Sequence, residues 1–215
     1  MAFFSMPEVS NSMSAHPLLA SPEAWKAEPQ PDAWRLESLA GRFVELGGGA
    51  DTAALTLCAR LIAGAQQAGG LAAWVGLPAS SFFPPDFAAA GVDLAALAVV
   101  RAADARQLWR ACDTLLRSGG FALVVADIDG GIVLPFGVQT RLSGLAQHHG
   151  AALVALTRER RPEGPRSSLV SLRADTFKRR AGHDCFACGA RVVKDKRGRP
   201  GWTHEELCRG TDGLC

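Results

Sequence analysis

The chain has 215 residues, of which 48% are hydrophobic and 20% are charged. This is the composition of an ordinary globular protein, and it excludes a largely disordered chain. No apolar run reaches the roughly 18 residues that a membrane helix needs, and the first residues lack the basic and apolar segments of a signal peptide. Six cysteines are too few for a disulfide scaffold of this length, so we expect a reduced, cytoplasmic protein.

The net charge of +2 conceals an uneven distribution of charged residues. From Arg158 onward the chain carries 14 Lys and Arg against 8 Asp and Glu, whereas the first 157 residues carry 9 against 13. A basic C-terminal part is typical of proteins that bind nucleic acid or an acidic partner, and it is equally compatible with a solvated basic surface.

Residues 1–31 are rich in proline and serine and show no apolar periodicity, so we expect a flexible N-terminal arm. The remaining 32–215 are expected to form a single core with a basic C-terminal segment. A short amphipathic helix over 33–40 is predicted to lead into this core.

Apolar residues then alternate between strand and helix spacing along the chain. Strands are predicted at Arg42–Leu46, Leu71–Val75, Leu97–Val100, Phe121–Asp127, Ala151–Leu156, Ser168–Arg173 and Cys185–Lys194. Helices are predicted at Asp51–Ala68, with Asp51 or Thr52 as its N-cap, and at Phe87–Ala90, Asp104–Arg117 and Phe136–His149. This order predicts an α/β fold with a mostly parallel sheet and helices on both faces, and a functional crevice at the carboxyl ends of the strands.

A glycine turn of Gly47, Gly48 and Gly49 separates the first predicted strand from the helix that follows. Backbone N–H groups at such a turn, together with the helix dipole, favour a bound phosphate. A functional phosphate-binding loop also needs a lysine for the phosphates and a hydroxyl for Mg²⁺. The lysine is missing here, and Asp51 places a carboxylate at the mouth of the loop that Thr52 does not offset. The pattern predicts a degenerate nucleotide site.

The order of these motifs resembles that of the RecA recombinase ATPase core, over roughly residues 33–210. The motifs are Arg42–Leu46, the glycine turn, the helix ending in Leu-Ile-Ala-Gly-Ala-Gln-Gln-Ala-Gly69, Ala90–Leu94, Phe121–Asp127 and Ala190–Arg197. Within this family the chain looks most like the ImuA group, the RecA-like proteins of bacterial damage-inducible mutagenesis cassettes. Such cassettes also encode a Y-family-polymerase-like protein and an error-prone polymerase. The resemblance implies a RecA-like, P-loop-NTPase-type fold.

The chain departs from the RecA pattern at the positions that carry hydrolysis. Thr52 falls near the Walker lysine position, and Pro78 falls near the position of the catalytic glutamate, where it cannot activate water. Asp127 matches the Walker B aspartate but has no lysine or glutamate to work with. We therefore expect no catalysis and no cofactor, and we interpret Asp127 as a strand-end acid that caps the following turn.

Basic residues match two regions that contact DNA or a neighbour in RecA. Lys194 and Lys196 match lysines that reach the neighbouring subunit's nucleotide in RecA filaments, which suggests docking on an active RecA subunit. A solvent-exposed basic strand end is the alternative. The segment with Arg158, Arg160, Arg161 and Arg166 replaces the second DNA loop. Without an interleaved aromatic residue it predicts weak, salt-sensitive binding of single-stranded DNA.

The spacing of Cys185, Cys188, His204 and Cys208 is similar to that of a zinc module, and Cys215 could substitute for His204. However, residues three apart in a strand point to opposite faces, so Cys185 and Cys188 would diverge. We therefore favour buried or incidental strand cysteines over a metal site.

The sequence thus predicts a non-catalytic RecA-like adaptor in error-prone translesion synthesis and SOS mutagenesis. Its expected partners are the polymerase-like cassette protein, RecA, or both, with single-stranded DNA as an auxiliary ligand. Two alternatives remain open: a cell-division inhibitor resembling SulA, and a residual DNA-dependent ATPase that uses a non-standard site.

Overall fold

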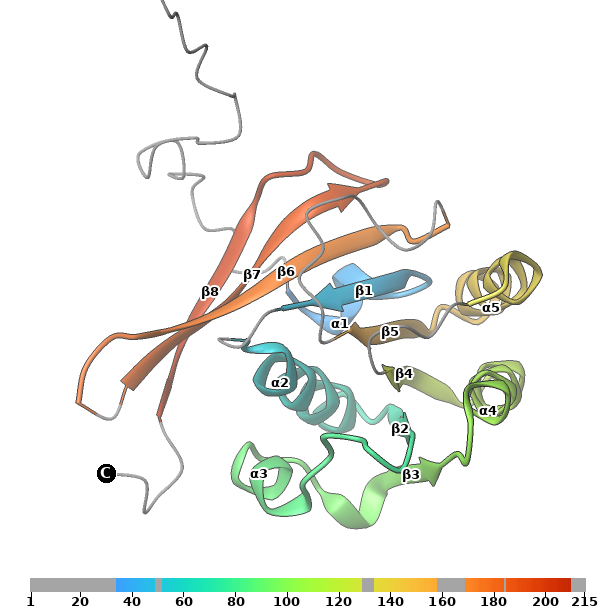
Figure 1. Cartoon of the computed structure of the whole chain (residues 1–215), viewed down its shortest axis with the longest axis horizontal. Helices are drawn as coiled ribbons and strands as arrows, with labels where there is room; N and C mark the ends of the chain where they lie inside the picture. The colour runs from blue at the N-terminus through green and yellow to red at the C-terminus, as the bar shows by residue number, and fades with distance from the viewer. Residues whose placement is uncertain (1–33, 49–51, 129–133, 158–168, 184, 210–215) are drawn as a thin grey trace, which may run out of the picture.

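A computed structural model describes residues 34–48, 52–128, 134–157, 169–183 and 185–209. Eight strands form one sheet in the order β3-β2-β4-β5-β1-β6-β7-β8 (Figure 1). The first six strands in this order are parallel, and β7 and β8 continue the sheet in antiparallel fashion. The predicted α/β class with a mostly parallel sheet is therefore confirmed.

The helices and strands alternate along the chain until β5, after which only strands follow. The helices are α1 (Leu36–Leu39), α2 (Ala54–Gln67), α3 (Pro84–Ala89), α4 (Ala105–Arg117) and α5 (Phe136–His149), with a 3₁₀ turn at Leu94–Ala96. The strands are β1 (Phe43–Gly47), β2 (Leu71–Gly76), β3 (Leu97–Arg101), β4 (Phe121–Ile128), β5 (Ala152–Thr157), β6 (Leu172–Arg180), β7 (Cys185–Asp195) and β8 (Thr203–Arg209).

Helices cover both faces of the sheet, as Figure 1 shows, and each face has its own apolar core. On one face, α1, α2 and α3 pack on alternate residues of the strands, with Leu57, Ile62 and Trp74 buried among them. On the other face, α4 and α5 bury Leu108, Leu142 and their neighbours against the sheet. The central strands are apolar on both faces because both are covered, which is the usual pattern for parallel sheets.

The sequence-based strands agree with the structure up to β5, and the strand predicted at Cys185–Lys194 agrees with β7 to within one residue. α5 has the predicted bounds, and β1 through β5 lie within one or two residues of the predictions. The strand predicted at Ser168–Arg173 is wrong in position, because β6 begins at Leu172 and continues to Arg180. β8 was not predicted. The predicted N-terminal arm lies outside the described residues.

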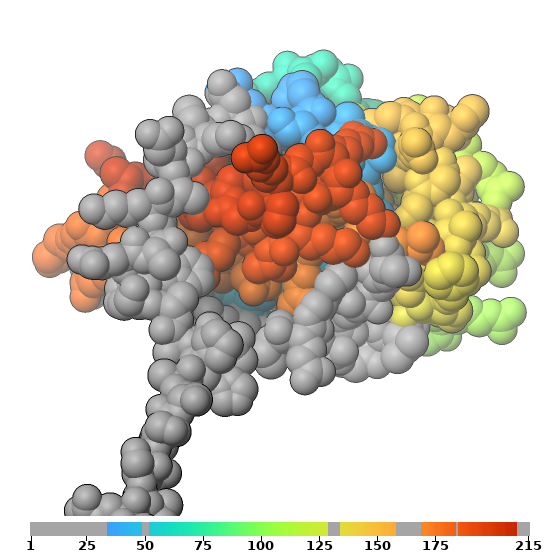
Figure 2. All heavy atoms as spheres, turned by 90° about the horizontal axis from the view of Figure 1, so that it is seen from above, coloured from blue at the N-terminus to red at the C-terminus, as the bar shows by residue number. Residues whose placement is uncertain are grey.

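The C-terminal strands form a ribbon that extends the sheet beyond the helices. Seen from above in Figure 2, the red atoms of this ribbon lie beside α1 in blue and α5 in yellow. Among the described helices none is both long and apolar enough to cross a membrane.

Candidate functional site

The carboxyl ends of β1 and β4 bring the predicted nucleotide site together at one edge of the sheet. Gly47 at the end of β1 and Ile128 at the end of β4 both pair with Thr157 of β5. Gly48 and Asp127 therefore lie near the same edge, as expected for parallel strands. Gly49 and Asp51 fall outside the described residues.

Two threonine hydroxyls pack against the glycine turn. The Oγ1 atoms of Thr52 and Thr176 lie 2.5 Å apart. The Thr176 hydroxyl donates a hydrogen bond of 2.9 Å to the carbonyl oxygen of Gly47. A Cβ atom on Gly48 would lie only 2.2 Å from Thr52 Oγ1 and 2.5 Å from Thr176 Oγ1. Gly48 is therefore a glycine because the hydroxyls occupy the space that a side chain would need.

Thr52 does not cap α2 as predicted. The residue at the N-cap position is Ala53, without a side-chain cap. Thr52 Oγ1 instead accepts a hydrogen bond of 3.1 Å from the backbone N–H of Ala54, the first residue of the helix. The Thr52 hydroxyl thus links the start of α2 to β6 through Thr176.

Asp127 is a buried carboxylate whose described partners belong to the loop after β2. Its side chain is 3% exposed. Oδ2 accepts hydrogen bonds from Ser80 Oγ at 2.6 Å and from the backbone N–H and hydroxyl of Ser81 at 2.8 and 3.1 Å. The Ser80 oxygen in turn accepts from the Trp74 indole N–H at 3.1 Å. Among the described residues, Asp127 thus caps the loop that follows β2; the turn after β4, which it is predicted to cap, lies outside the described residues.

This network leaves Asp127 Oδ2 fully engaged by the protein itself. A Walker-type aspartate must hold Mg²⁺ or its water ligands, whereas Oδ2 of Asp127 already accepts three hydrogen bonds from Ser80 and Ser81. Burial, and secondarily the charge of Asp127, raises the pKa of the nearby Cys58 thiol on α2 far above its ordinary value, so this thiol stays neutral. The described surroundings of Asp127 are therefore hydroxyl groups, an N–H group and a neutral thiol.

The predicted lysine pair lies at the opposite edge of the sheet. Lys194 is near the end of β7, where it lies opposite Arg173 of β6 in the strand register. Arg173 in turn lies opposite Glu45 of β1. Glu45 and Arg173 are buried, and Lys194 is half-buried. Burial lowers the pKa of Lys194 and the charge of Lys196 lowers it further, whereas Glu45 opposes the shift. Lys196 is exposed in the turn after β7.

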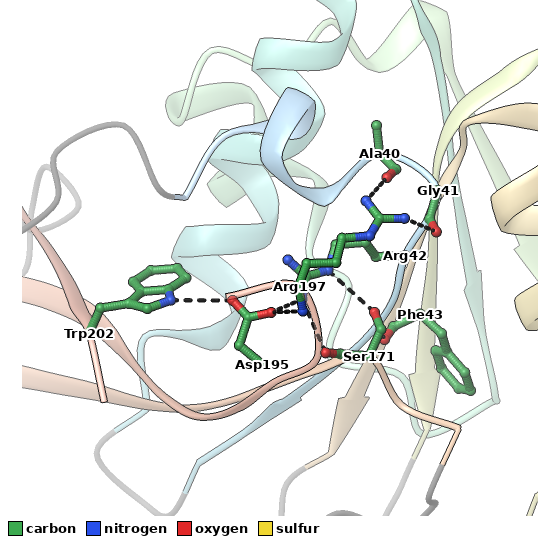
Figure 3. Close-up of polar contacts among 8 residues, drawn as sticks. All are labelled: Ala40, Gly41, Arg42, Phe43, Ser171, Asp195, Arg197 and Trp202. Atoms are coloured by element: carbon green, nitrogen blue, oxygen red, sulfur yellow. Dashed lines mark hydrogen bonds and ion pairs between the residues drawn. The ribbon is translucent and has the colours of Figure 1, made fainter. Parts of the chain in front are cut away.

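A buried ion pair fixes the turn that carries these lysines, as Figure 3 shows. Asp195 Oδ1 pairs with the guanidinium of Arg42, and both side chains are nearly inaccessible. Arg42 also donates a hydrogen bond of 3.0 Å to the carbonyl oxygen of Ser171. The Arg197 guanidinium donates to the carbonyl oxygens of Ala40 and Gly41 at 2.8 and 2.9 Å. The β7–β8 turn is thus tied to the entry of β1.

Sequence reasoning did not identify this cluster as part of the site. Arg42 and Asp195 lie 153 residues apart in the chain, and a local pattern carries no information on such a pair. The only sequence signal is that each is a charged residue at the end of an apolar strand. Such a side chain either faces solvent or is buried with a partner of opposite charge.

The four residues of the zinc-like spacing are divided between the two faces of the sheet. Cys188 and Cys208 lie in the core on the α2 face, and His204 pairs with Ala190 on that same face. Cys185, three residues before Cys188, points to the other face, as predicted for a strand. Within the described residues no group of three or more His, Cys, Asp and Glu side chains is placed to hold a metal. Cys215 lies outside these residues.

Cys188 and Cys208 interact directly on adjacent strands. Burial, with the hydrogen bond that the Cys208 thiol makes to Cys188 as the next cause, raises the pKa of Cys208 to about 12. The described cysteines are all free thiols.

The basic segment with Arg158, Arg160, Arg161 and Arg166 lies outside the described residues, so the structure does not place it.

Comparisons with known proteins identify relatives for part of the chain. No protein-family model matches it. It is 40% identical to RecA of Leifsonia xyli subsp. xyli over 88 residues, which cover 40% of this chain and 24% of that protein. It is 38% identical to RecA of Kineococcus radiotolerans, over 40% of this chain and 25% of that protein. It is 41% identical to RecA of Rubrobacter xylanophilus, again over 40% of this chain and 25% of that protein.

The chain thus spans about a quarter of the length of the curated relatives it matches. The mostly parallel sheet with helices on both faces is consistent with a RecA-like core. We conclude that the chain is related to RecA over part of its length.

Proposed function

We propose that this chain is a non-catalytic RecA-like adaptor in error-prone translesion DNA synthesis, of the ImuA type. In this role it binds the polymerase-like protein of a mutagenesis cassette, RecA, or both. The observation that carries the proposal is the packing of Thr52 and Thr176 against Gly48, beside an Asp127 carboxylate engaged by Ser80 and Ser81. These hydrogen bonds engage the described polar side chains at the edge where RecA proteins would hold a nucleotide.

The charge at this edge also opposes nucleotide binding. A nucleoside triphosphate needs cationic partners as well as backbone N–H groups. The sequence has no lysine between Lys26 and Lys178, so the glycine turn and α2 supply none. Asp51 adds a negative charge to the turn instead. We infer that the chain has lost ATP hydrolysis and works through contacts with other macromolecules.

The position of the lysine pair supports a contact between subunits. Lys194 and Lys196 lie at the opposite edge of the sheet from Gly48, so they do not serve the chain's own glycine turn. The ion pair of Asp195 with Arg42 holds their turn in place. Such a fixed, cationic turn suits the phosphates of a nucleotide held by a neighbouring RecA subunit. The Arg158–Arg166 segment would add weak contacts to single-stranded DNA.

Nucleotide binding tests the non-catalytic part of this proposal. Isothermal titration calorimetry with ATP and Mg²⁺ should show no saturable binding below about 1 mM, where the binding free energy is only about −4 kcal/mol. Phosphate release should equal that of buffer in the presence of single-stranded DNA. Micromolar binding with Mg²⁺-dependent turnover would instead identify the residual ATPase.

A binding assay with purified partners tests the adaptor part. Full-length protein is immobilised and exposed to RecA filaments or to the polymerase-like cassette protein. The Lys194→Ala/Lys196→Ala variant should lose RecA binding, whereas Arg60→Ala/Arg209→Ala, with the same change of charge on α2 and β8, should retain it. Equal binding by both variants would show that the lysine pair is only a solvated surface.

A further inference from the structure

A groove of about 640 Å³ runs between α4 and α5 on the face of the sheet opposite α2. It is separate from the glycine turn, and neither the nucleotide edge nor the lysine pair contributes to it. Its walls carry four arginines and a single acidic residue, which are Arg106, Arg110, Arg117, Arg141 and Asp113.

The arginines of the groove are only partly neutralised. Asp113 accepts hydrogen bonds from Arg117 at 3.0 Å and from Arg141 at 2.8 Å, so one carboxylate serves two guanidinium groups. Arg106 and Arg110 are one helical turn apart on α4 and exposed. Within the described part of the chain, no carboxylate pairs with either of them. Two adjacent guanidinium groups are thus available to anionic ligands.

The floor of the groove is apolar. Trp109, 5% exposed, and Val138 line it between the two helices. The indole N–H of Trp109 is buried and has no hydrogen-bond partner in the described residues. A buried N–H without an acceptor is costly and uncommon in folded proteins. An apolar floor between cationic walls is complementary to a ligand that is acidic at its ends and apolar at its centre.

We propose that this groove binds an acidic peptide segment of a partner protein. Carboxylates of the segment contact Arg106 and Arg110, and one apolar side chain packs on the half-buried Val138. The observations favour a peptide over single-stranded nucleic acid, because base stacking needs an exposed aromatic ring and Trp109 is almost fully covered.

Fluorescence anisotropy with the full chain tests this proposal. The probe is a fluorescein-labelled, glutamate-rich short peptide with one central leucine. Its affinity should fall at least about tenfold in Arg106→Ala/Arg110→Ala, because each charge-assisted hydrogen bond contributes strongly. Val138→Asp should weaken binding as well by placing a carboxylate in the floor. Arg60→Ala/Arg209→Ala should change it by less than about twofold.

Three further probes distinguish the outcomes. A peptide with glutamine in place of glutamate, and one with serine in place of leucine, should each bind more weakly than the first peptide. No saturable binding of the acidic peptide to the wild type, or equal binding by Arg106→Ala/Arg110→Ala, would overturn the proposal. It would also be overturned if that variant lost binding of labelled oligo-dT while its peptide binding stayed unchanged, since the groove would then serve nucleic acid. Circular dichroism confirms that each variant is folded. These results are independent of the nucleotide and lysine-pair experiments.

Discussion

The hydroxyl oxygens of Thr52 and Thr176 lie 2.5 Å apart and meet directly beside the backbone of Gly48. This contact joins the start of α2 to β6, two segments that are 124 residues apart in the chain. The two hydroxyls occupy the space that a side chain at position 48 would need. The consequences for stability can be measured.

Thr176→Val should lower the free energy of unfolding by about 1–3 kcal/mol, because the buried carbonyl of Gly47 and the hydroxyl of Thr52 each lose a partner. Urea unfolding followed by circular dichroism measures the change. Thr176→Ser keeps the hydroxyl and should cost less than Thr176→Val. If the valine variant were as stable as the wild type, the hydroxyl pair would contribute nothing to the fold.

Gly48→Ala should be destabilising by about 1–3 kcal/mol, since the added methyl group would overlap both threonine hydroxyls. Gly64→Ala is the matched control. It lies in α2, where a Cβ meets nothing within 4 Å, and should stabilise the protein by about 0.5–1 kcal/mol. Thermal unfolding of the two variants should therefore shift in opposite directions. A shared direction would contradict the packing around Gly48.

Asp127→Asn should destabilise the protein by about 1.5–3 kcal/mol, because the three hydrogen bonds from Ser80 and Ser81 converge on one carboxylate oxygen, and a neutral amide oxygen accepts them more weakly. Asp86→Asn on the surface of α3 is the control and should stay within about 0.5 kcal/mol of the wild type. Chemical unfolding at pH 7 compares the two. A stable Asp127→Asn variant would show that the carboxylate is not needed for the fold.

Asp195→Asn should reveal a stability contribution that depends on pH. Burial by itself raises the pKa of Asp195, but the Arg197 N–H, the Arg42 guanidinium and the Trp202 indole outweigh burial and lower this pKa below its ordinary value of 3.8. A lowered pKa stabilises the fold above about pH 4, where Asp is ionised in the unfolded chain. This stabilisation disappears as the pH falls through the folded-state pKa.

The Asp195→Asn variant should therefore be less stable than wild type by about 3–5 kcal/mol at pH 7, because Arg42 stays buried without its counter-charge. The difference should shrink steadily as the pH falls below about 4. Urea titrations at several pH values follow it. A difference that stays constant down to pH 2 would exclude ionised Asp195 as the source.

The parallel half of the sheet could be predicted from sequence because its strands are buried on both faces. Phe121–Asp127 is a continuous apolar run, and Asp127 lies at the sheet edge where the order of elements places it. In α4, Leu108 and Cys112 are buried one helical turn apart. Trp109 and Leu116 are equally buried there, because the α4–α5 contact widens the apolar face beyond one stripe.

Within the antiparallel ribbon, β7 was predicted, but β6 and β8 could not be predicted in the same way. β6 ends in Lys178, Arg179 and Arg180, which are exposed, so its second half has the composition of a loop. β8 carries three charged residues, Glu205, Glu206 and Arg209, and has only one buried residue, Cys208. Since Thr176 lies in the part of β6 that was missed, its contact with Thr52 could not be foreseen either.

The place of β1 in the sheet has a consequence for synthesis on the ribosome. Among the described strands β1 comes first in the chain, yet Phe43 pairs with Leu153 and Val44 with Leu172. Both neighbours of this fully buried strand therefore emerge more than a hundred residues later. Throughout most of translation β1 is an apolar strand without a partner, which makes it a binding site for chaperones. A chain that ends at Leu156 keeps only one neighbour for β1 and loses the Asp195 and Arg197 contacts that close it, so we expect β1 to stay exposed in a shortened chain.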